Sequence, residues 1–216
     1  MQSERRMNLA CRRWALAAAR PIHVWLRSQK IDLCRDYLSD ADLTLLDLGG
    51  GTGVAGEFLG LYSHFSSVVL ANLQPSLQEQ NGYRISLVAA DGCRLPFREK
   101  SFDWIFSNAV IEHVGDYERQ RQFANEVRRV AAKGYFVTTP NKYFPIEPHA
   151  LLPFYQFLSP GWQRRVLKLS PGYLQEYEEI NLLSARQLQR LFPEAKIVAT
   201  GTPLFRNSLV ACYRAS

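Results

Sequence analysis

The sequence predicts an α/β fold organised around a doubly wound, mostly parallel sheet of seven strands. Short apolar runs alternate with helix-like segments along most of the 216 residues, and this alternation is typical of parallel sheets covered on both faces. A turn containing four glycines follows the first run, which is where such folds bring the backbone against a ligand. The last two runs are separated by a short connection, as an antiparallel pair at the sheet edge would be.

The expected strands are apolar runs, most of them rich in β-branched and aromatic residues. They cover residues 45–48, 67–73, 84–91, 101–108, 135–139, 195–200 and 209–213. The helices expected between them cover residues 54–62, 75–80, 116–131 and 184–192. Ser184 and Gln187 have the spacing of a capping box at the start of the last of these helices. Ahead of the sheet, residues 1–38 have apolar side chains at helical spacing, with a break at Pro21.

The composition indicates one ordinary globular domain, expected at residues 39–216. A chain with 47% hydrophobic and 12% aromatic residues can bury a full core at this length. No apolar run approaches the length that spans a membrane, and an early alanine-rich run is cut by Arg20 and Pro21, so we expect a cytoplasmic protein. The four cysteines lack the paired spacing of zinc ligands, which predicts free thiols and no metal site.

The formal net charge of +6 is concentrated in the first thirty residues, which contain seven basic residues and one acidic residue. A groove for nucleic acid would spread its charge over the fold and interleave it with aromatic side chains, so the sequence disfavours a nucleic-acid partner. We interpret residues 1–30 as a solvated basic helix that packs its apolar stripe on the domain. The alternative is an amphipathic segment that contacts an anionic membrane surface or covers the mouth of the active site.

The turn after the first expected strand has a diagnostic glycine spacing. Residues 45–53 read LLDLGGGTG, so the third glycine of a dinucleotide fingerprint would fall at Val54, and the Gly-Lys-Ser/Thr of a P-loop is missing. This pattern resembles the first motif of class I S-adenosylmethionine-dependent methyltransferases. The resemblance implies a Rossmann-like methyltransferase fold with S-adenosylmethionine as cofactor. It also implies cofactor contacts at Asp47, Gly49, Gly50, Gly51 and Gly53.

The resemblance continues at the ends of the second and third expected strands. Asn72 and Leu73 stand where the family usually has an acid that accepts hydrogen bonds from both ribose hydroxyls, and a carboxamide makes that contact weaker. After the third strand, the run DGCRLPF resembles the family's third motif. It implies that Asp91 accepts a hydrogen bond from the adenine amino group and that Gly92 and Cys93 wall the ring. An ordinary aspartate-capped turn is the alternative at Asp91.

A fourth segment completes the order of motifs. Residues 102–108 read FDWIFSN and are followed by IEHV, which resembles the branch called the type 11 methyltransferase domain and implies a cofactor contact at Asn108. Displacement at a sulfonium needs mainly positioning, and a hydroxyl or protonated amine acceptor also needs a base. His113 and His149 are the candidate bases, and a purely structural role is the alternative for His113.

Residues 141–183 are expected to recognise the methyl acceptor. This stretch is rich in proline and aromatic residues and follows the fifth expected strand, so it should lie over the carboxyl edge of the sheet. The aromatic side chains suit an apolar or sugar-like acceptor, or else form a small satellite core. We therefore predict methyl transfer to an oxygen, less readily a nitrogen, of a small-molecule, glycan or lipid-linked acceptor. The alternatives are methylation of tRNA or protein, and a regulatory module that binds S-adenosylmethionine without catalysis.

Overall fold

Seven strands form a single sheet in the order β3-β2-β1-β4-β5-β9-β8. The computed structural model describes residues 28–38, 44–49, 59–74, 85–147, 149–170, 177–202 and 205–215. The strands are β1 (Thr44–Leu48), β2 (Ser67–Asn72), β3 (Ile85–Ala89), β4 (Phe102–Asn108), β5 (Ala131–Pro140), β8 (Lys196–Gly201) and β9 (Arg206–Arg214). The first five are parallel, and β9 lies antiparallel between β5 and the edge strand β8. The predicted fold class is confirmed, including the antiparallel pair.

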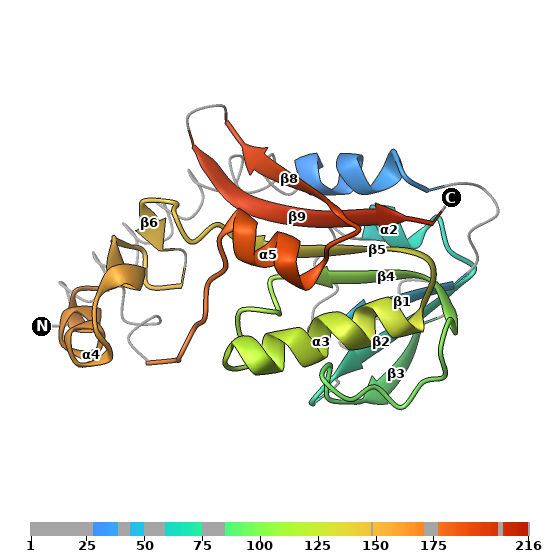
Figure 1. Ribbon diagram of the computed structural model, residues 1–216, viewed down its shortest axis with the longest axis horizontal. Coiled ribbons are helices and arrows are strands. Elements are labelled where there is room, and N and C mark those ends of the chain that lie inside the picture. The colour runs from blue at the N-terminus through green and yellow to red at the C-terminus, as the bar shows by residue number, and fades with distance from the viewer. Residues whose placement is uncertain are drawn as a thin grey trace, which may run out of the picture.

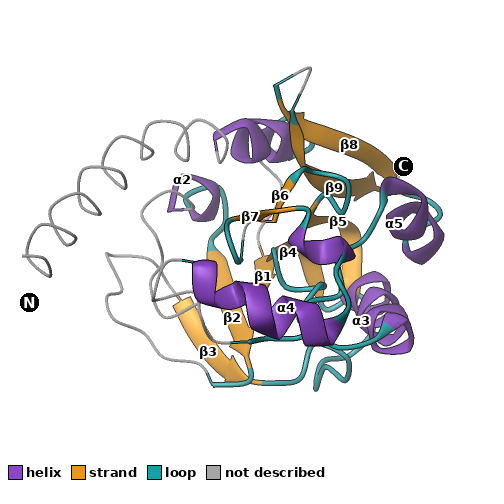
Figure 2. Ribbon diagram, turned by 90° about the vertical axis from the view of Figure 1, so that its left-hand side faces the viewer, coloured by secondary structure: helices purple, strands orange, loops and turns teal. Residues whose placement is uncertain are grey.

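Helices cover both faces of this sheet (Figures 1 and 2). On one face lie α3 (Tyr117–Val130) and α5 (Ala185–Leu191); on the other lie α2 (Leu59–Tyr62) and the helical residues 28–35. The capping box predicted for α5 is confirmed, because Ser184 and Gln187 exchange both of its hydrogen bonds. The predicted helix at 75–80 and residues 1–27 lie outside the described part of the chain. Within that part, no helix is long and apolar enough to cross a bilayer.

The two faces of β4 belong to two different core clusters. Successive side chains of a strand point to opposite faces, so Trp104 packs with the α2 side and Ile105 with the α3 side, and both are fully buried. The Trp104 ring stacks on Phe136 of β5 with ring centroids 4.9 Å apart. Such close packing on both faces holds the carboxyl ends of β1, β4 and β5 at fixed positions.

The stretch between β5 and α5 forms a separate small lobe beyond the ends of the parallel strands (Figure 1). Its elements are β6 (Ile146–Glu147), β7 (Leu152–Pro153), α4 (Pro160–Val166) and two short 3-10 helices, Tyr155–Phe157 and Leu167–Leu169. Its buried cluster contains only Ala150, Tyr155 and Leu167 among the described residues. Most of the aromatic side chains in this lobe are therefore available for contacts other than a core of its own.

Asp47 in β1 is a buried acid whose carboxyl group accepts a hydrogen bond from the Tyr62 hydroxyl. Burial raises the pKa of Asp47 to about 7, although the hydrogen bond from Tyr62 opposes the shift. Because the folded-state pKa lies above the unfolded one, the native state keeps a proton that the unfolded state releases. Ionisation of Asp47 therefore lowers stability as pH rises through the window between the two pKa values.

We expect Asp47→Asn to remove this loss of stability. Each pKa unit corresponds to about 1.4 kcal/mol, so from about pH 5 to about pH 8 the free energy of unfolding should fall on the order of 2–4 kcal/mol more in the wild type than in the variant. Urea unfolding at both pH values measures the difference. Asp36→Asn, at an exposed helix-end position, is the control and should behave like the wild type. Equal pH dependence in the wild type and Asp47→Asn would contradict the assignment.

Candidate cofactor site

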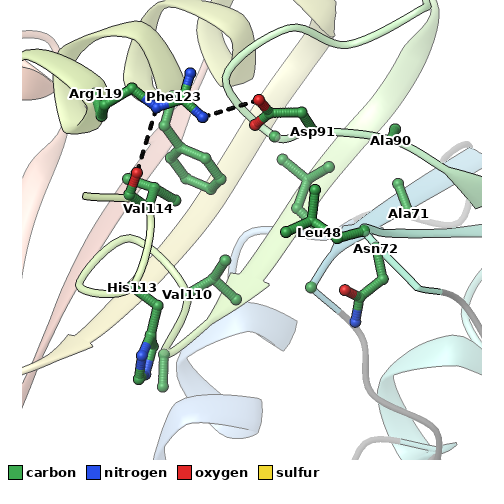
Figure 3. A pocket seen from close by; sticks show the side chains of 14 residues that line it. Leu48, Ala71, Asn72, Ala90, Asp91, Val110, His113, Val114, Arg119 and Phe123 are labelled. Carbon is green, nitrogen blue, oxygen red and sulfur yellow. Dashed lines mark hydrogen bonds and ion pairs between the residues drawn. The ribbon is translucent and has the colours of Figure 1, made fainter. Parts of the chain in front are cut away.

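A cavity of about 330 Å³ opens where the parallel strands end (Figure 3). It lies at β1, from which the sheet winds toward β2 and β3 in one direction and toward β4 and β5 in the other. Ligands of doubly wound folds bind at this switch point, and the volume is in the range of small-molecule sites. The described residues that line it are Leu48, Gly49, Ala71, Asn72, Leu73, Ala90, Asp91, Gly92, Ala109, Val110, His113, Val114, Arg119 and Phe123.

Gly49 brings the backbone against one wall of this cavity. Its φ of +79° belongs to the left-handed region, and a Cβ at this position would lie 2.3 Å from Cγ2 of Val110. The Gly49 amide donates to the Ala71 carbonyl oxygen at 2.7 Å, which ties the turn to the end of β2. The turn therefore requires glycine at this position. The predicted contacts Gly50, Gly51 and Gly53 lie outside the described residues.

Asp91 points into the cavity from just beyond β3 and is held by two groups. Its Oδ1 accepts from the Cys93 amide at 2.9 Å, and its Oδ2 accepts from Nη2 of Arg119 at 2.8 Å (Figure 3). The Arg119 hydrogen bond, supported by the Cys93 amide, holds the pKa of Asp91 below its ordinary value. The carboxylate is therefore ionised at neutral pH. It is placed to accept a further hydrogen bond from a ligand, and its contact with adenine stays a prediction.

Asn72 and Leu73 also line the cavity, at the end of β2. The Ala90 amide donates to the Asn72 carbonyl oxygen at 2.9 Å, so the ends of β2 and β3 are level with each other. Leu73 is 73% exposed, which places it at the mouth. The structure therefore places Asn72 in the lining of the cavity, and its contact with the ribose stays a prediction.

We expect Asn72→Asp to bind S-adenosylmethionine at least as tightly as the wild type. A carboxylate accepts hydrogen bonds from two hydroxyls more strongly than a carboxamide does, and the gain should be about tenfold or less. Calorimetry on both proteins measures the dissociation constants. A loss of affinity in the variant would remove Asn72 from the ribose site.

The side chains of three other residues predicted to contact the cofactor have hydrogen-bond partners within the protein. The carboxyl group of Asp47 is buried against Tyr62, and the Cys93 thiol donates to the Arg119 carbonyl oxygen at 3.3 Å. The Asn108 carboxamide oxygen accepts from Thr138 Oγ1 at 2.8 Å and from the Lys30 ammonium at 3.3 Å. Each is adjacent in sequence to a residue that lines the cavity, and its contact with the cofactor stays a prediction.

Both candidate histidines lie at one end of this site. His113 lines the cavity, and its ring meets that of His149 edge-on with centroids 5.0 Å apart. Nδ1 of His149 lies 2.6 Å from Oε1 of the buried Glu147 in β6. Burial lowers the pKa of His149, but the hydrogen bond and charge of Glu147 outweigh it, so the net shift is upward. The lobe after β5 thus places a second imidazole against His113, which lines the cavity.

Sequence reasoning missed two lining residues on α3, Arg119 and Phe123. They stand one helical turn apart, so they share a face, and that spacing is the signal that could have found them. Phe123 packs under Gly92 so closely that a Cβ there would lie 2.8 Å from its ring. The ring and the guanidinium form the side of the cavity opposite Asn72 (Figure 3).

Comparisons with known proteins agree with this arrangement. The family profile described as "Methyltransferase domain" matches residues 46–138. Phosphoethanolamine N-methyltransferase 2 of Caenorhabditis elegans is 36% identical over 84 residues, which are 35% of this chain and 19% of that protein. Demethylmenaquinone methyltransferase of Staphylococcus haemolyticus is 25% identical over 184 residues, which are 84% of this chain and 73% of that protein.

Among solved structures, N-methyltransferase NodS from Bradyrhizobium japonicum in complex with S-adenosylhomocysteine has a similar fold. Its TM-score is 0.57 at 16% identity, and the match covers 87% of this chain and 86% of NodS. Four observations point to the same kind of protein, an S-adenosylmethionine-dependent methyltransferase. They are the glycine turn, the strand order, the cavity at the switch point and the matching profile. The chain therefore contains this methyltransferase domain at residues 46–138, in a sheet with the fold of S-adenosylmethionine-dependent methyltransferases, and its cofactor is S-adenosylmethionine.

Proposed function

We propose that this methyltransferase modifies an oxygen, or less readily a nitrogen, of a small-molecule, glycan or lipid-linked acceptor held under residues 141–183. The observation that carries the proposal is the pair His113 and His149, which joins the cofactor cavity to that lobe. A proton-accepting pair beside a methyl donor suits an acceptor that must lose a proton. The names of two relatives specify demethylmenaquinone and phosphoethanolamine, which supports a small acceptor.

The residues that line the cavity fit S-adenosylmethionine. Gly49 and Gly92 let Val110 and Phe123 pack directly against the backbone, so the cavity has a compact, largely apolar wall on these sides. Asp91 provides an ionised acceptor for an amino group. When bound, the cofactor supplies a methyl group on a sulfonium; an acceptor lone pair forms the new bond while the electron pair of the C–S bond stays on sulfur. The chain has to hold the two reactants in line and exclude water.

For a hydroxyl acceptor, the proton released during transfer goes to the His113 imidazole. His113 Nδ1 lies 2.8 Å from Oε1 of Glu178, which orients the ring. His149 and Glu147 pack behind His113 and fix the direction of its ring. The proton is then passed to water.

The surface of the 141–183 lobe supports an apolar or lipid-linked acceptor. Large hydrophobic side chains are concentrated on it in exposed positions, although such side chains are usually buried. They are Tyr143, Ile146, Leu151, Phe154, Phe157, Leu158, Trp162 and Leu169. Arg164 and Arg165 lie on α4 among them and suit an anionic group on the same acceptor. We therefore assign acceptor recognition to this lobe.

Nitrogen methylation is the second candidate, because both NodS and the Caenorhabditis elegans relative are named N-methyltransferases. Methyl-labelled S-adenosylmethionine should be incubated with the full chain and, separately, with extracted lipids, polar metabolites, tRNA and proteins. We expect label in the lipid or small-molecule fraction, and mass spectrometry then identifies the methylated atom. Label confined to tRNA or protein would overturn the proposal.

Once an acceptor is known, His113→Ala and His149→Ala should lower kcat about 100-fold, because general-base catalysis contributes at least this much. The affinity for S-adenosylhomocysteine should stay within about threefold, since the proton acceptor acts on the other reactant. His64→Ala, at an exposed histidine after α2, is the matched control. Unchanged kcat in both variants would exclude a role for the histidine pair in transfer.

A further inference from the structure

Glu112 is a buried acid with one unsatisfied oxygen. It follows β4, its side chain is 0% exposed, and its Oε2 accepts a hydrogen bond from Thr139 Oγ1 at 3.0 Å. Its Oε1 has no hydrogen-bond partner among the described residues. A buried carboxylate oxygen without a partner costs free energy, so the position calls for a proton or a cation.

The two histidines of the site surround this unsatisfied acid. Glu112, His113 and His149 each offer one ligand atom, and the three atoms lie within 4.8 Å of one another. Two ligands bonded to one ion at about 2.0–2.2 Å lie about 3–4 Å apart, so small side-chain rotations close the cluster around an ion. Two imidazoles and one carboxylate are a common ligand set for divalent transition metals.

Each histidine also has a carboxylate at its Nδ1 atom, as metal-binding histidines often do. Nδ1 of His113 lies 2.8 Å from Glu178, and Nδ1 of His149 lies 2.6 Å from Glu147. A carboxylate that accepts the proton of one imidazole nitrogen fixes the tautomer and leaves the other nitrogen to coordinate. Glu147 is itself held, because its second oxygen accepts from the Ala150 amide at 2.6 Å. The cluster is therefore oriented from both sides.

We propose that Glu112, His113 and His149 bind one divalent transition-metal ion, with Nε2 of each histidine and Oε1 of Glu112 as ligands. Imidazole ligands favour Zn²⁺ over Mg²⁺, which prefers an all-oxygen shell; the carboxylate also suits Mn²⁺. The spacing of the cysteines predicted no metal site, and the proposed ligands do not include a cysteine. The ligands come instead from the loop after β4 and from the β6–β7 hairpin, and the fold brings them together.

The position of the ion gives it a role in the proposed function, on which this step rests. His113 lines the cofactor cavity, so an ion with three protein ligands keeps open positions on that side. An acceptor hydroxyl bound to such an ion would have a lowered pKa, would release its proton to water and would present an oxygen lone pair to the methyl carbon. With an ion bound, His113 and His149 would be its ligands and water would accept the proton; the proton transfer to His113 described above would apply to the protein without the ion.

Metal binding can be measured without cofactor or acceptor. The full chain is stripped with a chelator and titrated with Zn²⁺, Mn²⁺ and Mg²⁺ by calorimetry, and the bound metal is counted by mass spectrometry after dialysis. We expect one equivalent of Zn²⁺ or Mn²⁺ with a dissociation constant of about 10 µM or below, and Mg²⁺ at least about tenfold weaker. Glu112→Gln and His149→Ala should each weaken binding at least about tenfold, and His64→Ala should not.

The outcomes separate this inference from the proposed function. If Glu112→Gln fails to fold, His149→Ala still decides, with circular dichroism and S-adenosylhomocysteine binding as checks on its fold. Metal binding below one equivalent, or equal affinity in the wild type and His149→Ala, would overturn the metal site. Stoichiometric binding lost in His149→Ala supports the site even if no small acceptor is found.

Discussion

The Gly49→Ala variant is expected to lose cofactor binding and to unfold well below the wild-type temperature. A methyl group at this position would lie 2.3 Å from Cγ2 of Val110, in a turn whose φ is +79°. A left-handed alanine costs about 1–2 kcal/mol, and overpacking adds about 1–3 kcal/mol. A total of about 3 kcal/mol lowers the melting temperature by roughly 6–12 °C in a chain of this size.

Differential scanning fluorimetry with and without S-adenosylhomocysteine measures both effects in one experiment. The wild type should melt higher with the ligand, and Gly49→Ala should show no such shift. Gly161→Ala is the matched control, because a Cβ at Gly161 in α4 meets no atom within 4 Å. A Gly49→Ala protein with the melting temperature and ligand shift of the wild type would show that the turn does not shape the cavity.

Asp91→Asn is expected to weaken cofactor binding about 10-fold to 100-fold while the protein stays folded. The carboxylate accepts from Arg119 and from the Cys93 amide, and it faces the cavity. A carboxamide keeps one acceptor but loses the charge that strengthens hydrogen bonds to a ligand amino group and holds Arg119 in place. The ion pair with Arg119 is partly exposed, so it contributes little to stability.

Equilibrium dialysis with labelled S-adenosylmethionine measures the dissociation constant of this variant. Glu118→Gln is the matched control, because Glu118 also pairs with an arginine at the same helix but does not line the cavity. It should bind like the wild type. Asp91→Asn binding as tightly as Glu118→Gln would move the adenine contact away from Asp91.

The order of the elements could be predicted because each strand of the parallel sheet is a nearly continuous apolar run, and this pattern survives in the sequence. The predicted start of β5 was wrong. The helix was expected through residue 131 and the strand from 135, but β5 begins at Ala131. Gly134 is a poor strand former by propensity, yet Trp104 and the backbone of Tyr213 fill the space that a Cβ there would need. Tertiary packing decides this boundary.

The candidate site, too, could be predicted only in part from the sequence. Asn72 and Asp91 could be placed because residues at the ends of parallel strands share one edge of the sheet. Arg119 could not be placed, because its contact depends on how α3 turns against that edge. The contact of His113 with His149 depends on the lobe between β5 and α5, which has little apolar core of its own. No helical or strand-like hydrophobic pattern in its sequence predicts how this lobe folds. The positions of Arg119 and of the histidine pair are therefore set by long-range packing, which a sequence pattern does not show.

Calorimetric titration of S-adenosylhomocysteine into the purified full chain tests the central claim most directly. The cavity at the end of β1, β2 and β3 predicts a saturable isotherm with one ligand per chain and a dissociation constant of about 100 µM or below. A folded chain that gives no binding heat, and no thermal shift at a ligand concentration of about 1 mM, would contradict the assignment of this cavity to the cofactor.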